Sequence, residues 1–150
     1  MRSLYDPERV QEIHDRAARL TPDSARDWGT MTVSQGLEHM AKSLRMAVGE
    51  DRTPRLFVGR LLGGLVKNLV LRDDKPMHRN SPTAPSLVVK GNPDFETQRT
   101  AVLALVDRFQ AAGPRGCTTH PHPFFGKLTP EEWGTLVHKH LDHHLRQFGV

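Results

Sequence analysis

A helix-start signal occurs three times in this chain, as a capping residue followed by a proline and acidic residues. It stands at Asp6-Pro7-Glu8, at Asn92-Pro93-Asp94 and at Thr129-Pro130-Glu131-Glu132. A side-chain cap, a proline at the first helical position and acidic residues in the first turn each stabilise the start of an α-helix. These three places therefore predict the beginnings of three helices.

Apolar residues at helical spacing follow each signal and also fill a fourth segment that starts near Thr32. We expect helices over residues 7–20, 32–48, 93–112 and 130–148, with Gly49 ending the second and Gly113-Pro114 ending the third. The residues that we expect to be largely buried are Leu37, Leu44, Val102, Phe109, Leu136 and Leu141. Only 87–89 could form a short strand. The sequence thus predicts an all-α fold, a four-helix bundle.

Residues 54–71 are strongly apolar but contain three glycines and the basic residues Arg60 and Lys67. The segment could be an extra helix packed against the bundle or an element on a membrane surface. We favour the packed helix, which would not insert in lipid, because a core of this size needs the apolar surface. A long loop over 72–93 would then lead to the third bundle helix.

Composition limits the remaining possibilities. The 150 residues, 37% of them hydrophobic, fit one domain over 1–150. No apolar run reaches the roughly 18 to 20 residues of a membrane span, and the N-terminus does not resemble a signal peptide. With a single cysteine, Cys117, these features predict a cytoplasmic protein. The 21 basic residues are offset by 17 acidic ones, and without a reading motif we expect no nucleic-acid partner.

The last predicted helix carries its histidines in an informative pattern. Its buried stripe, about 100° wide, consists of Trp133, Leu136, Val137, His140, His144 and Gln147. His140 and His144 are one turn apart on that stripe, so their nitrogens can converge on one metal ion, whereas unpaired imidazoles buried there would be costly. His138 lies nearly opposite and is expected in solvent. His143, at the edge of the stripe, could belong to either side.

The end of the chain resembles a known family. His140-Leu141-Asp142-His143-His144-Leu145-Arg146-Gln147 is similar to the closing-helix motif of the DinB/YfiT-like superfamily. SPTAP and THPHPFFGKLTPEEWGTLVHKHLDHHLRQFG resemble, within it, the DUF1569 group. The resemblance implies a four-helix bundle, often a homodimer, whose metal is held by one histidine of the second helix and two of the last. These would be His39, His140 and His144. Related families include metal-dependent thiol transferases and maleylpyruvate isomerases.

The position of His39 is predicted differently by periodicity and by resemblance. It lies roughly 140° from the apolar stripe of its helix, which indicates an exposed residue. The resemblance makes it a ligand, provided that another segment covers this side, and 54–71 is the segment we expect there. His120 and His122, in a His-Pro-His-Pro loop, are either structural or close enough to line the mouth of the site. With His143 and Gln147 they complete the expected pocket.

Three neutral imidazoles would leave a divalent ion, Zn, Ni or Fe, with open coordination positions. Such an ion lowers the pKa of water to about 7 or holds a thiolate, which favours hydrolysis or thiol transfer on a small-molecule substrate. Glu38 and Asp142 are the candidate general bases, although Glu38 could simply be solvated and Asp142 could pair with Arg146. The alternative function is a non-catalytic scaffold or interaction protein whose histidine cluster is structural or vestigial.

Overall fold

Every regular element of the protein is a helix. The computed structural model describes all 150 residues. It contains five α-helices and one 3₁₀ helix: α1 (Pro7–Ala18), α2 (Val33–Ala47), α3 (Phe57–Leu71), η1 (Pro85–Leu87), α4 (Phe95–Gly116) and α5 (Pro130–Gln147). The prediction of an all-α fold is confirmed. The strand considered at 87–89 is wrong, because η1 occupies the start of this stretch.

Side-chain caps explain where four of the α-helices begin. A carboxylate oxygen of Asp6 accepts from the backbone N–H of Glu8 at 3.0 Å. Thr32 and Thr129 each form a reciprocal capping box with the residue three positions on. Helix α4 begins slightly later than expected, because Asp94 and not Asn92 is its N-cap. Helix α3 has no side-chain cap, so its start carried no such signal in the sequence.

The predicted helix ends also hold. Gly49, with φ of +82°, follows the last turn of α2. In α4 the helical conformation is broken at Gly113, whose φ of +63° and ψ of −170° lie outside the helical region. A glycine adopts such left-handed angles without the steric cost that a side chain would impose. The interruption falls where the sequence placed the end of the helix.

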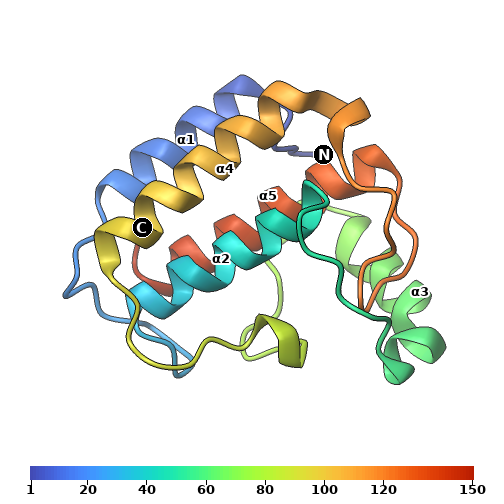
Figure 1. Ribbon diagram of the computed structural model, residues 1–150, viewed down its shortest axis with the longest axis horizontal. Coiled ribbons are helices and arrows are strands. Elements are labelled where there is room, and N and C mark those ends of the chain that lie inside the picture. The colour runs from blue at the N-terminus through green and yellow to red at the C-terminus, as the bar shows by residue number, and fades with distance from the viewer.

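Helices α1, α2, α4 and α5 surround the core. Helix α4 packs against α1 and α2, while α5 contacts all the other α-helices, and α3 lies at one end of the molecule (Figure 1). One cluster of 24 buried apolar residues fills the interior. The six residues expected to be buried all belong to it: Leu37, Leu44, Val102, Phe109, Leu136 and Leu141.

Helix α3 is the expected extra helix and contacts α5, but it does not turn its apolar side inward. Only Gly59, Gly63 and Leu71 are buried, and most of its large apolar side chains point into solvent. The expectation that residues 54–71 supply apolar surface to the core is therefore wrong, because the helix turns its small residues to the protein. No helix of this protein combines the length and the apolar character that crossing a membrane requires.

Candidate metal centre

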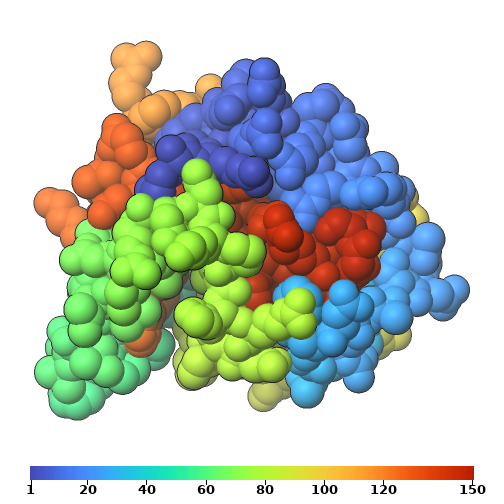
Figure 2. Space-filling model, turned by 180° about the vertical axis from the view of Figure 1, so that it is seen from behind, coloured from blue at the N-terminus to red at the C-terminus, as the bar shows by residue number.

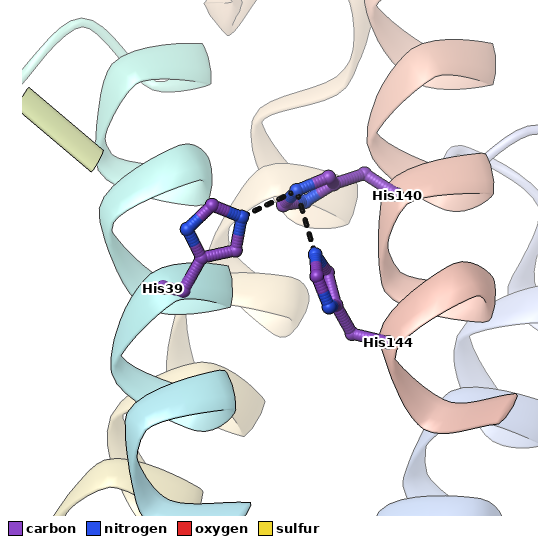
Figure 3. Close-up of side chains that lie close together, drawn as sticks. All are labelled: His39, His140 and His144. Atoms are coloured by element: carbon purple, nitrogen blue, oxygen red, sulfur yellow. Dashed lines mark hydrogen bonds between the residues drawn. The ribbon is translucent and has the colours of Figure 1, made fainter. Parts of the chain in front are cut away.

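Three histidine rings from two helices meet inside the protein. His39 comes from α2, and His140 and His144 come from α5, one turn apart (Figure 3). Nε2 of His140 lies 2.9 Å from Nε2 of His39 and 3.2 Å from Nε2 of His144. His39 is 3% exposed and His144 is 7% exposed. The structure thus brings together the three histidines that the resemblance named.

Hydrogen bonds on the far side of two rings determine which nitrogen is free. Nδ1 of His39 lies 3.0 Å from the carbonyl oxygen of Leu87, and Nδ1 of His144 lies 2.8 Å from Oε1 of Gln147. Because a carbonyl oxygen only accepts, each Nδ1 carries a proton and donates it, which leaves the lone pair on Nε2. Metal-binding histidines are usually oriented by such a bond from the second ring nitrogen.

Burial keeps these rings neutral. It lowers the pKa of His144 to about 3. It also takes the pKa of His140 well below the ordinary value, with His144 and His39 adding to the effect. In His39 burial lowers the pKa although the hydrogen bond with Leu87 opposes it. Neutral imidazole is the form that binds a metal ion, so the rings need no prior loss of protons near pH 7.

The spacing of the three rings suits a single ion. The ligand atoms all lie within 4.8 Å of one another. Nitrogens about 2.0 to 2.1 Å from a common ion, at bond angles of 90 to 109°, are about 2.9 to 3.4 Å apart. The two separations from His140, 2.9 and 3.2 Å, fall in this range. The three histidines are therefore close enough to hold a metal ion.

A close approach of two helices positions His39 opposite the rings of α5. A Cβ atom placed on Gly36, one turn before His39, would lie 2.4 Å from the ring of Phe148. Only glycine permits this distance between α2 and the end of α5. The cover over His39 is η1, through Leu87, and not residues 54–71 as expected. The exposed position that periodicity alone predicted for His39 is wrong for the same reason.

Two of the expected pocket residues support the centre from outside. Gln147, which is 3% exposed, accepts from His144 and donates to the backbone oxygen of Trp28 at 2.8 Å. The ring of His143 lies 5.1 Å from that of His144 and 5.4 Å from that of Trp28, measured between centroids. Gln147 therefore holds the ring of His144 in place, while His143 lies between the cluster and the surface near Trp28.

The two loop histidines differ from each other. Nε2 of His120 lies 3.3 Å from the backbone oxygen of Thr53, which is a structural contact. Nδ1 of His122 accepts from the backbone N–H groups of Phe124 and Phe125, at 3.2 and 3.1 Å. Burial, and next the charge of Arg55, lowers the pKa of His122 to about 4. His122 is thus neutral and carries its proton on Nε2, so it is suited to donate and not to bind a metal through that atom.

Neither candidate base joins the group of three histidines. Asp142 accepts from Arg146 at 2.8 Å and from Arg16 at 2.7 Å. Its pairing with Arg146, which was the alternative to a role as base, is therefore confirmed. Burial tends to raise the pKa of Asp142, but the hydrogen bonds from these arginines outweigh it and leave the pKa below its ordinary value. Glu38 lies 3.6 Å from Nζ of Lys42 on the same helix.

His138 corrects a further expectation. It is 2% exposed, and neither ring nitrogen has a hydrogen-bond partner. The solvent position predicted for it assumed that α5 has one buried side, whereas α5 is buried almost all round. The Leu87 carbonyl, which is the partner of His39, was not predicted. The only signal for it was the proline-rich SPTAP stretch, which leads into η1.

The cluster is largely closed to solvent. His39 and His144 are buried and His140 keeps partial exposure. One surface pocket of about 390 Å³ is lined by Trp28, Arg79, His143 and Arg146 among others, and reaches the outer side of the centre through His143. A second, of about 380 Å³, lies near Leu71 and Glu131. Neither is lined by the three histidines themselves.

These observations define an all-helical protein with a buried group of three histidines able to share one ion. The chain belongs to the DUF1569 family, described as a protein of unknown function, whose model matches residues 3–149. Comparison with curated proteins gives no match, and neither does comparison with solved structures.

Proposed function

We propose that His39, His140 and His144 are the ligands of a divalent metal ion, and that the protein is a metal-dependent transferase or hydrolase acting on a small molecule. One observation carries this proposal: Nδ1 of His39 and of His144 are both held by carbonyl oxygens, so both Nε2 lone pairs are free beside His140. In a cluster without metal, Nε2 of His140 could donate its one proton to only one of these two lone pairs, and the other would stay buried without a donor.

When bound, Zn, Ni or Fe would supply a Lewis acid able to activate water or a thiol near neutral pH. The protein's own part is to orient the ligands through Leu87 and Gln147 and to limit the access of water. His122 would present an N–H donor from the loop before α5, because the two backbone donors at Nδ1 leave its proton on Nε2. Neither Glu38 nor Asp142 is assigned the role of base.

The resemblance and the composition of the chain add three elements to the proposal. We infer that α1, α2, α4 and α5 form a DinB-like four-helix bundle, that residues 1–150 are one domain, and that the protein is a cytoplasmic homodimer. The single apolar core supports the first two. Sedimentation of the purified protein tests the last, since a monomer at all concentrations would exclude it.

The second candidate is a non-catalytic protein with a structural histidine cluster. The low exposure of His39 and His144 favours it, because catalysis requires a coordination position that a substrate can reach. Loading the protein with Co²⁺ separates the two candidates, since the visible spectrum of Co²⁺ changes when a ligand is added. A small thiol or azide should alter the spectrum of an open site. An unchanged spectrum would favour the structural cluster.

A further inference from the structure

Helix α3 is attached to the protein by its smallest residues. A Cβ atom on Gly63 would lie 2.0 Å from the carbonyl oxygen of Phe124, and one on Gly59 would lie 2.6 Å from the same atom. The two glycines, one turn apart, let the helix rest directly on the backbone before α5. Nζ of Lys67 also lies 2.7 Å from a carboxylate oxygen of Glu132. The orientation of α3 is therefore fixed by backbone contact and an ion pair.

The opposite side of α3 is apolar and exposed. Its large side chains are Phe57 (77% exposed), Val58 (48%), Leu61 (69%), Leu62 (50%), Leu65 (65%) and Leu69 (52%). At about 100° per residue they fall within a sector of about 140°. Apolar patches of more than a few hundred Å² are rare on soluble monomers and mark interaction sites. Figure 2 shows α3, in green, at one corner of the molecule, where a flat surface could reach it.

The charged residues of the segment that carries this face are all basic, and two of them, Lys67 and Arg72, pair with Glu132 and Asp73 outside it. Residues 52–72 contain Arg52, Arg55, Arg60, Lys67 and Arg72 and no acidic residue. Arg60, on the flank of the apolar sector, is exposed and forms no ion pair within the chain. A helix with an apolar face and a basic polar side is typical of elements that lie in the interface of a membrane containing anionic lipids.

We propose that α3 docks this protein onto an anionic membrane surface, with the side chains from Phe57 to Leu69 in the lipid interface and Arg60 at the headgroups. The helix has 15 residues, so at about 1.5 Å per residue it is too short for a hydrocarbon core of about 30 Å and must lie in the plane. A second copy of the chain is a poorer fit for this face, because neither of two paired α3 helices offers an acidic residue to the unpaired Arg60 of the other.

Flotation with vesicles tests the proposal without reference to the metal site. The full chain should float with vesicles of phosphatidylcholine and phosphatidylserine, and less with phosphatidylcholine alone. The double substitution Leu61→Gln and Leu65→Gln should lower the partition coefficient roughly tenfold or more, because each leucine loses apolar burial. Both side chains are exposed, so circular dichroism and melting should not change.

Two matched variants complete the test. Val58→Gln should weaken binding and Val88→Gln should not, although both valines are 48% exposed, because only Val58 lies on α3. Arg60→Gln should reduce the preference for anionic vesicles. Absence of flotation with anionic vesicles overturns the proposal. Vesicle binding that is abolished by salt but unchanged by the leucine substitutions also overturns it. A dimer that the leucine substitutions dissociate, in a protein that binds no vesicle, would overturn it as well.

Discussion

Helix α5 keeps polar side chains in the interior, whereas α3 keeps large apolar side chains in solvent. Buried polar residues of α5, none more than 8% exposed, include His138, Asp142, His144 and Gln147. On α3, Phe57 and Leu61 are more than two-thirds exposed. In most proteins polar side chains are exposed and large apolar side chains are buried. Both helices depart from this, and each departure costs stability unless a partner offsets it. The partners on α5 are largely other residues of this chain, while the partner of α3 lies outside it.

The largest effect should come from removing a charge inside α5. Asp142→Ala removes the nearer of two carboxylates from the Arg16 guanidinium, which is 8% exposed, and leaves Glu12 at 3.3 Å. Breaking a buried ion pair costs about 3 to 5 kcal/mol when the remaining charge is uncompensated, and with Glu12 still present urea denaturation should show a drop at the lower end, about 3 kcal/mol. The control is Asp107→Ala, which removes a carboxylate 2.7 Å from Nε2 of His14 at the surface and should cost about 1 kcal/mol or less. Equal losses of unfolding free energy in the two variants would show that the buried ion pair stabilises the protein no more than the surface contact does.

Acid should destabilise the metal-free protein through the buried imidazoles. The pKa of His144 is lowered from 6.5 to about 3, so between these values the unfolded chain binds a proton that the folded protein does not. Stability therefore falls as pH falls through this window. In His144→Gln the slope between about pH 6 and pH 4 should be shallower by about 1.4 kcal/mol per pH unit. Denaturation of chelator-treated protein at several pH values gives the slope of the unfolding free energy against pH. Equal slopes in the wild type and the variant would contradict the burial of a neutral His144.

Replacing the support of His144 should weaken metal binding without removing a ligand. Gln147→Met keeps the volume but loses the acceptor for Nδ1 of His144 and the donor to Trp28. Loss of such an outer contact typically lowers metal affinity about 10- to 100-fold. Competition with a chromogenic chelator measures the change. Gln11→Met, on the exposed side of α1, is the control, and an affinity equal in both variants would exclude the role of Gln147.

The smallest effect should be confined to α3. Gly63→Ala meets the backbone of Phe124, which cannot move aside cheaply, whereas a Cβ on Gly64 meets nothing within 4 Å. Gly63→Ala should therefore loosen α3 and speed proteolysis within 57–71 while the core stays folded. Gly64→Ala should slow cleavage, because alanine is a better helix former by about 1 kcal/mol. The same rate in both variants would show that α3 does not rest on its glycine side.

The predictable parts of this protein are those with local causes. Asp6 and Thr129 predict where their helices begin, because an N-cap residue bonds to neighbours in the chain. His140 and His144 could be placed together because they share one helix. His39 could not be placed by periodicity, since its cover comes from Leu87, 48 residues away. The prediction for His138 was wrong because it assumed that its helix has one buried side. The prediction for α3 was wrong because it assumed that apolar residues turn inward.

The metal content of protein purified without an affinity tag tests the central claim most directly. The wild type should contain close to one divalent ion per chain. His144→Ala should contain almost none, while its helix content persists because the Thr129 cap is untouched and alanine favours helix. His120→Ala, which changes a histidine outside the group of three, should keep the ion. A wild type that retains no divalent metal after growth with Zn, Ni and Fe, or a His144→Ala variant that retains all of it, would contradict the account.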